Sequence, residues 1–364
     1  MNPRDSAQRP RWGWHACALG VTLAAATSLI TLPPVPPPPA PAAPISPTQR
    51  GQDPIIIPGV LPDGSPYTPL YVLPSGTSLG QAPNQDGSRL RLVERAADGK
   101  VRVLRQLPVA NTPQYVGFTE AEGEIVWAES LAGDREGRTE IWAVTPESKT
   151  APRRVTADTG DVVFSNSEYD IVARNGRLHW LAVATRTGHT ELRSVSLAGG
   201  AVTTRVVPGE WTLSAWPWLV SASASGPVRL RTVDTGRELT VPTRPTELVT
   251  CSPSWCRVLT HSDDGSTQLE VMRVDGSRRR PVAGDAVAVA VVDVALLDRF
   301  EVLSADTQAT ASRSQLLIYD IATDRTVVIA ERASTVQARG GMVWWSTSPS
   351  KTSAWWVLNL RTLR

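Results

Sequence analysis

The chain has 364 residues, of which 41% are hydrophobic and 20% are charged, as is ordinary for a folded domain. Its net charge of +2 excludes both the basic footprint of a nucleic-acid-binding protein and an acidic coat. Electrostatics alone therefore does not identify a partner.

The first 32 residues have the order of an export signal. Arg4, Arg9 and Arg11 precede the apolar stretch His15–Leu32. A bilayer needs roughly 20 apolar residues, so this length fits both a cleaved signal peptide and a spanning anchor. We expect residues 1–32 to be one of these two. The protein is then either anchored at the cell envelope or, after cleavage, secreted.

A proline-rich segment follows the export signal. The run Pro33–Pro47 favours extended polyproline II geometry and cannot bury a core. We therefore assign residues 33–53 to a semi-rigid linker and residues 54–364 to the folded domain.

One phrase recurs seven times in that domain: an apolar strand that ends in a small or acidic turn and leads at once into another strand. Its core positions are Val93, Val144, Val195, Val233, Val274, Ile321 and Leu360. The steps between them are 51, 51, 38, 41, 47 and 39 residues, a spacing typical of β-propeller blades. We predict an all-β, seven-bladed propeller. Six blades is the alternative, because the first blade must fit its inner strands into the proline- and glycine-rich stretch 67–85.

Tryptophan doublets support blades that are covered on both faces. Neighbouring residues on a strand point to opposite faces, so Trp344-Trp345 and Trp355-Trp356 each need two apolar surroundings. A propeller provides them, because each blade packs between two others. The last repeat ends after its third strand. We expect Pro54–Leu61, or the segment "LYVLP" at Leu70, to close the ring by pairing there.

At this point the sequence resembles known propeller families. The phrases "LRTVDTGR" at Leu230, "LEVMRVDGS" at Leu269 and "IYDIATDR" at Ile318 look like the third strand and polar turn of TolB-like and WD-type repeats. The resemblance covers about residues 86–364 and is closest to exported TolB-like propellers of actinobacteria. It implies a protein-docking propeller outside the cytoplasm, and it carries over no functional residue.

Two cysteines in the folded domain are close in sequence. Cys251 and Cys256 bracket four residues between apolar strands, and opposed hairpin residues lie within disulfide range. We predict a structural disulfide. A zinc site would need two further ligands, and no nearby histidine pair supplies them. We expect neither a metal nor another cofactor.

Five residues are candidates for a binding site. Trp211, Trp216 and Trp218 crowd one inner-strand region, where Pro217 cannot donate to a ladder and should end a strand. One of these rings could reach the channel mouth and stack on a sugar or a partner's side chain, and the alternative is core packing. His179 and His261 are the histidines that a channel-mouth enzyme could use.

These features lead to one functional prediction with two alternatives. We predict a non-enzymatic, exported propeller that binds another envelope or extracellular protein as an interaction or scaffold module. The first alternative is a lyase- or hydrolase-type enzyme with its site at the central channel. The second is a carbohydrate-binding propeller.

Overall fold

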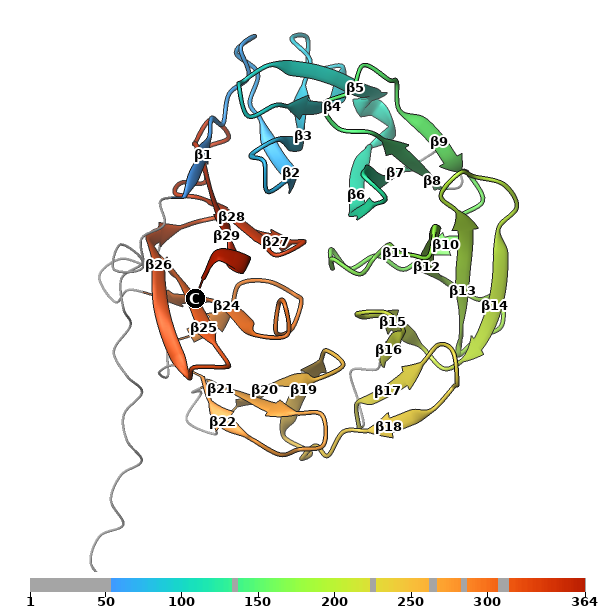
Figure 1. Ribbon diagram of the computed structural model, residues 1–364, viewed down its shortest axis with the longest axis vertical. Helices are drawn as coiled ribbons and strands as arrows, with labels where there is room; N and C mark the ends of the chain where they lie inside the picture. Colours follow the sequence, from blue (N-terminus) through green and yellow to red (C-terminus); the bar gives the residue numbers. More distant parts are fainter. Residues whose placement is uncertain are drawn as a thin grey trace, which may run out of the picture. The chain divides into compact units, whose positions relative to one another are not determined.

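The computed structural model describes residues 54–132, 137–222, 227–261, 267–282, 287–306 and 314–363. In this part of the chain, seven antiparallel sheets stand side by side in a ring (Figure 1). The predicted seven-bladed propeller is confirmed, and the six-bladed alternative is wrong. The predicted export segment 1–32 and linker 33–53 lie outside the described residues. No helix in the described ranges is long and apolar enough to span a membrane.

The blades follow one another along the chain, and each runs from an innermost strand outward. Blade one contains β2 (Thr68–Val72), β3 (Ser78–Pro83), β4 (Arg89–Arg95) and β5 (Val101–Pro108). Blade two contains β6 (Gln114–Ala121), β7 (Glu124–Leu131), β8 (Arg138–Val144) and β9 (Arg153–Thr156). Blade three contains β10 (Asp161–Val162) and β11 (Val172–Arg174), which both pair with β12 (Arg177–Val183), and then β13 (His189–Ser196) and β14 (Thr203–Pro208).

The remaining blades repeat this pattern. Blade four contains β15 (Trp211–Leu213), β16 (Trp218–Ser221), β17 (Arg229–Thr232) and β18 (Glu238–Thr240). Blade five contains β19 (Glu247–Cys251), β20 (Trp255–His261), β21 (Thr267–Arg273) and β22 (Arg280–Pro281). Blade six contains β23 (Val287–Val289), β24 (Phe300–Asp306), β25 (Ser314–Asp320) and β26 (Arg325–Ala333). Blade seven contains β27 (Val336–Arg339), β28 (Met342–Ser346), β29 (Trp355–Asn359) and β1 (Ile55–Ile57).

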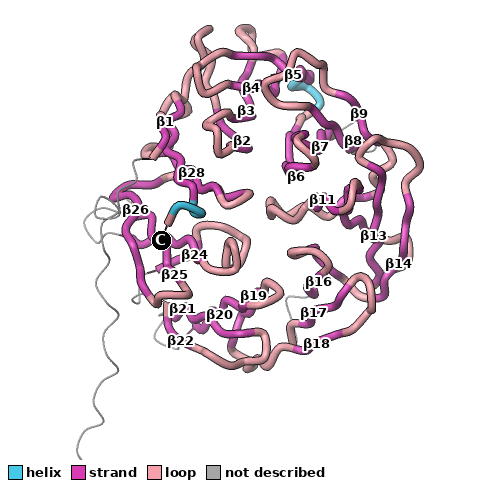
Figure 2. The backbone as a smooth tube through the Cα atoms, viewed as in Figure 1, coloured by secondary structure: helices cyan, strands magenta, loops and turns pink. Residues whose placement is uncertain are grey.

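Helix is confined to short turns in the described residues. Two 3-10 helices, η2 (Val109–Asn111) and η3 (Leu360–Thr362), follow strands of blades one and seven (Figure 2). The chain reverses between strands at turns such as Asp98-Gly99, where the Asp98 carboxylate accepts from the Lys100 amide at 3.0 Å and Gly99 has φ +86°. A positive φ favours glycine, so this dipeptide sets the hairpin.

The ring closes through the N-terminal strand, as one of the two predicted pairings requires. β1 pairs with β29, with Ile55 opposite Val357 and Ile57 opposite Trp355. Ile57 is 3% exposed and packs into the cluster around Trp344 and Trp355. The other candidate, at Leu70, belongs to β2, the innermost strand of blade one. The first and last parts of the domain therefore share one blade.

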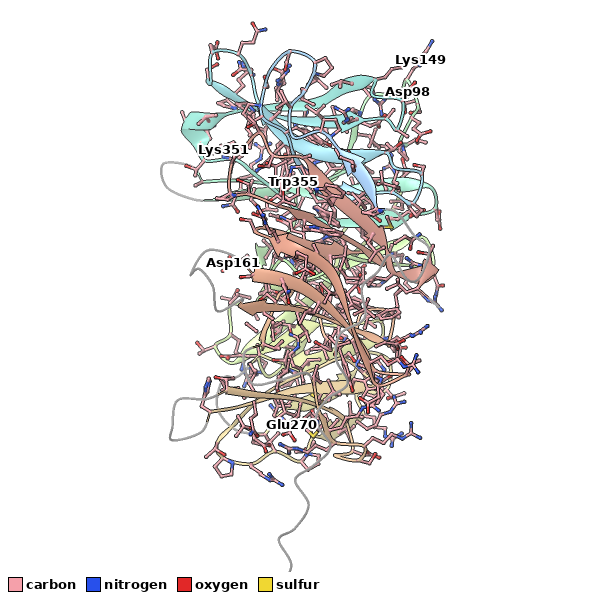
Figure 3. The ribbon with its side chains drawn as sticks, turned by 90° about the vertical axis from the view of Figure 1, so that its left-hand side faces the viewer. Asp98, Lys149, Asp161, Glu270, Lys351 and Trp355 are labelled. Carbon is pink, nitrogen blue, oxygen red and sulfur yellow. A yellow bond between two sulfur atoms is a disulfide. The ribbon has the colours of Figure 1, made fainter. Side chains whose placement is uncertain are left out.

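The tryptophan doublets lie where two-sided covering was predicted. Trp344 and Trp345 are 1% and 2% exposed on β28. Trp355, labelled in Figure 3, is also buried, and Trp356 is partly buried. Trp344 packs with the cluster next to blade one, whereas Trp345 packs with the cluster next to blade six. Each doublet therefore serves two blade interfaces.

A contact that the repeat phrase did not reveal joins neighbouring blades. Arginines of outer strands donate to backbone carbonyl oxygens just after the third strand of the next blade. The pairs are Arg102 with Thr145, Arg153 with Leu197, Arg205 with Val233 and Arg280 with Ile321. The backbone carbonyl oxygen just after each of these third strands thus accepts a hydrogen bond from an arginine of the preceding blade.

Candidate functional site in the central channel

Blade three sends residues 163–171 into the centre of the ring, between β10 and β11. Its polar side chains shape this loop, because the Ser167 hydroxyl accepts from the Tyr169 amide at 3.0 Å and the Asp170 carboxylate accepts from the Ser165 amide at 2.9 Å. Asn166 takes a positive φ of 62°, which asparagine tolerates better than most residues. The loop therefore folds on local hydrogen bonds and not as a strand.

This loop crosses the channel and meets blade six. The Ser167 hydroxyl and the Glu168 amide both donate to the carboxylate of Asp293, the amide at 2.9 Å. Ser167 and Asp293 are each 8% exposed. Burial raises the pKa of Asp293, and the two donors and the charge of Arg339 oppose that rise.

Blade seven contributes the third part of the crossing. Arg339, at the end of β27, donates to the carbonyl oxygens of Phe118 at 3.0 Å and Ser167 at 2.9 Å. It also donates to the Asn166 side chain at 3.3 Å. The guanidinium is 5% exposed and has no ion-pair partner among the described residues, and burial lowers its pKa. We call Ser167, Glu168, Asp293 and Arg339 the bridge.

A buried ion pair holds the blade-six end of the bridge. Arg257 of β20 contacts Glu301 of β24 at 2.7 Å and donates to the carbonyl oxygen of Asp293 at 2.7 Å. Glu301 also accepts from the Ala295 amide at 2.7 Å. The side chains of Arg257 and Glu301 are 5% and 0% exposed, so the segment that carries Asp293 is fixed by a pair that water does not reach.

Two cavities lie on either side of the bridge. The larger compartment has a volume of about 390 Å³ and is lined by blades one, two, three, six and seven. The smaller compartment has a volume of about 140 Å³ and is lined by blades three, four, five and six, with hydroxyl groups from Ser214, Thr250 and Ser252 among its walls. Tyr169 lines both. The bridge therefore divides the channel.

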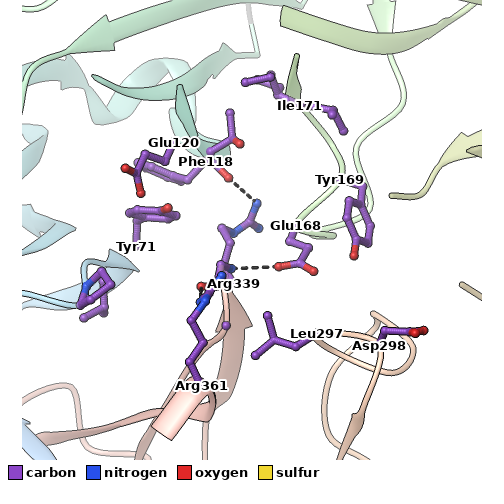
Figure 4. Close-up of a pocket in the computed structure, with 17 residues that line it drawn as sticks. Tyr71, Phe118, Glu120, Glu168, Tyr169, Ile171, Leu297, Asp298, Arg339 and Arg361 are labelled. Atoms are coloured by element: carbon purple, nitrogen blue, oxygen red, sulfur yellow. Dashed lines mark hydrogen bonds between the residues drawn. The ribbon is translucent and has the colours of Figure 1, made fainter. Parts of the chain in front are cut away.

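The larger compartment gathers charged and aromatic side chains from the ends of innermost strands, from the segments that follow them and from η3. Figure 4 shows Arg339 and Glu168 near its middle, with Tyr71 and Glu120 on one side and Tyr169 on the other. Asp298 and Arg361 complete the charged lining. Its volume lies within the usual range for ligand pockets, which is on the order of 300–1,000 Å³.

Tyr71 has the most unusual environment in this lining. Its ring stacks on Phe118 with 6.2 Å between centroids, and the residue is 5% exposed. The hydroxyl has no hydrogen-bond partner among the described residues and borders the compartment, where it is open to water or a ligand. Burial, the largest cause, raises the pKa of Tyr71 to about 12. The hydroxyl is therefore available to a ligand that enters the compartment.

The predicted tryptophans lie elsewhere. Trp211 is 2% exposed, packs in the core of blades three and four, and donates from its indole nitrogen to the Pro208 carbonyl oxygen at 2.8 Å. Trp216 is partly buried at the turn between β15 and β16, Trp218 is partly buried as the first residue of β16, and the Trp216-Pro217 bond is cis. Pro217 thus falls between strands, as predicted. None of the three lines the larger compartment.

The predicted histidines are not brought together. His179 lies near the start of β12 with its imidazole 4.1 Å from the Trp216 ring, measured between centroids, and burial lowers its pKa to about 4. His261 is exposed at the end of β20, where its Nδ1 lies 3.0 Å from the Thr267 hydroxyl. The two histidines lie on the second strands of different blades, three and five.

The predicted disulfide joins Cys251 and Cys256, which are opposite each other on β19 and β20. Cys251 also borders the smaller compartment. Disulfides are typical of exported proteins and rare in the cytosol. No group of histidine, cysteine and acidic residues suited to a metal ion occurs within the described ranges.

Sequence reasoning did not find the bridge or the larger compartment. Their residues come from five blades, so no single local motif contains all of them. One signal was available: "SNSEYD" at Ser165 is a cluster of turn-forming residues inside what should be the innermost strand of a blade.

Comparisons with known proteins bear on the fold. No protein-family model and no curated protein matches the sequence. Many solved structures are similar, among them the following three. An acylaminoacyl peptidase from Pyrococcus horikoshii is 8% identical, with a TM-score of 0.43 over 65% of this chain and 43% of that chain. The propeller domain of the Trilobed protease from Pyrococcus furiosus is 10% identical, with a TM-score of 0.47 over 85% of this chain and 96% of that chain. A putative TolB from Agrobacterium tumefaciens is 13% identical, with a TM-score of 0.38 over 71% of this chain and 93% of that chain.

The recognition of a TolB-like or WD-type propeller is confirmed as a statement about the fold. The chain spans less than half of the length of the acylaminoacyl peptidase. The prediction that the protein is not an enzyme is contradicted, since the similar structures include an acylaminoacyl peptidase and the propeller domain of a protease. A propeller fold does not exclude an enzyme, and enzymatic turnover is therefore an outcome of the experiments below.

Proposed function

We propose that this protein is an exported propeller of the cell envelope that binds an envelope or extracellular protein at the larger compartment of its channel. The observation that carries the proposal is the hydroxyl of Tyr71, which borders the compartment and has no hydrogen-bond partner among the described residues. Charged groups of both signs surround it, namely Glu120, Glu168, Arg339 and Arg361. Such a concentration of buried and polar groups in one cavity is typical of binding sites.

The disulfide and the predicted export signal support a location outside the cytoplasm. The disulfide between Cys251 and Cys256 fits an oxidising location outside the cytoplasm. A partner protein in that location could reach the larger compartment of the channel, because Glu120, Asp298 and Gly340 in the lining of this cavity are exposed.

The test is affinity capture of the full chain from its own envelope fraction, with the variant Tyr71→Phe beside the natural protein. The ring and its contact with Phe118 are kept in this variant, and only an unpaired hydroxyl is removed. Deleting such a group should leave the melting temperature unchanged or higher. The proposal predicts that a stoichiometric partner is captured by the natural chain and reduced in the variant.

Two results would contradict or redirect the proposal. Equal capture by both proteins would remove the larger compartment as the binding site. Turnover of a captured protein, tested by mass spectrometry of its fragments and lost in Tyr71→Phe, would place an enzymatic reaction at the same compartment.

A further inference from the structure

We propose that the group received by the larger compartment is a basic side chain, lysine or arginine, of an extended polypeptide segment. This inference rests on the function proposed above and specifies the chemistry of the partner. The charges that remain unmatched in the compartment support it.

Three carboxylates face the compartment with oxygen atoms to spare. Glu120 and Asp298 are exposed and have no hydrogen-bond or ion-pair partner among the described residues. Glu168 accepts from the Gly340 amide at 2.9 Å, and it also interacts with the Tyr169 hydroxyl and with the charge of Arg339. Burial raises the pKa of Glu168, as expected for a carboxylate whose charge is incompletely compensated.

The two arginines of the lining are already engaged. Arg339 donates to three oxygen atoms of blades two and three, and the carboxylates of Asp170 and Asp293 act electrostatically on it from outside the compartment. Arg361 donates to the carbonyl oxygen of Gly340. Arg361 keeps further N–H groups free, but the lining carries three carboxylates against two guanidinium groups, and this charge balance favours a cationic guest over an anionic one.

Tyr71 gives an independent reason to expect a donor in this place. Its hydroxyl is unpaired among the described residues, and the residue is only 5% exposed, so an incoming ammonium or guanidinium group could donate to it. The ring of Tyr169, which is only partly buried, borders the same space and could contact a cation. The long apolar stem of a lysine or arginine would lie along Leu297 and Ile171.

The experiment uses three blocked pentapeptides, each with four glycines and a central lysine, glutamine or glutamate. Binding to the natural full chain is measured by ligand-observed NMR at low salt. The lysine peptide should bind at least about fivefold more tightly than the glutamine peptide, and the glutamate peptide most weakly. Added salt should reduce the difference, because the attraction is between partly exposed charges.

Variants locate the effect. Glu120→Gln combined with Asp298→Asn should reduce the lysine preference about fivefold or more. Glu210→Gln is the matched control, because Glu210 is an exposed carboxylate that lies outside the compartment. Both changes are at exposed positions, so the melting temperature should not change.

The outcomes separate the two proposals. Capture of a partner that depends on Tyr71, together with peptides that bind without a preference for lysine, would overturn only the basic-group inference. A double variant that keeps the full lysine preference would overturn that inference as well. Absence of any Tyr71-dependent capture would overturn the proposed function itself. Lysine preference lost in the double variant and kept in Glu210→Gln supports the inference.

Discussion

Closure of the ring by the N-terminal strand can be tested at two adjacent isoleucines of β1. Ile57 is 3% exposed and packs against Trp344 and Trp355, whereas Ile56 is 52% exposed. Replacing a buried isoleucine by alanine costs about 2–5 kcal/mol, through lost transfer free energy and the cavity left behind. We expect Ile57→Ala to lower the free energy of unfolding by that amount, and Ile56→Ala to change it by less than about 0.5 kcal/mol.

Comparing the two variants separates the effect of the buried side chain from that of strand pairing, because both variants keep the backbone hydrogen bonds between β1 and β29. Urea unfolding followed by tryptophan fluorescence gives the free energies, and the midpoint should shift without a large change in slope. Equal effects of the two substitutions, or a negligible effect of Ile57→Ala, would refute the closure.

Three further predictions concern buried groups. Burial raises the pKa of Asp170 from an ordinary 3.8 to about 6, so the folded state binds this proton more tightly than the unfolded state, and the free energy of unfolding should fall as the pH rises from about 4 to about 6. The expected loss across that window is about 3 kcal/mol, and Asp170→Asn should remove it. Urea titrations at several pH values measure this, and a variant with an unchanged pH profile would contradict it. Glu301→Gln should cost about 3–5 kcal/mol because it leaves Arg257 buried without its charge partner, and a thermal melt equal to that of the natural protein would show that the ion pair is not structural. Replacing Cys251 and Cys256 together by alanine should cost only about 2 kcal/mol, because the closed loop is short, and a much larger loss in chemical unfolding would mean that the disulfide does more than close the loop.

The architecture could be predicted from the sequence because each blade repeats the same local chemistry. The spacing of Val93, Val144 and Val195 measures the blade, and Trp344-Trp345 indicates covering on two faces. The closing strand was also within reach, because Ile55–Ile57 is an apolar run outside the repeats and the last repeat lacks an outer strand. Repetition makes these features visible without any long-range information.

The channel could not be predicted in the same way. The bridge joins Ser167 to Asp293, which are 126 residues apart, and Arg339 to the carbonyl oxygen of Phe118, which is 221 residues away. Such contacts arise only when the ring closes, and no spacing rule relates them. Trp211 is a candidate from its size and aromatic character, yet its ring is buried in the core of blades three and four. The sequence around Tyr71 is that of an ordinary inner strand and does not indicate a binding site.

The central claim is that a partner enters the larger compartment, and site-specific photo-crosslinking tests it most directly. A benzophenone amino acid would replace Leu297, which is 38% exposed in the compartment lining, and in a second protein Val206, which is 51% exposed on outer strand β14. Irradiation in envelope fractions should give a discrete crosslinked product from position 297 and none from position 206. A product from position 206 alone would place the partner on the outer rim and contradict the claim.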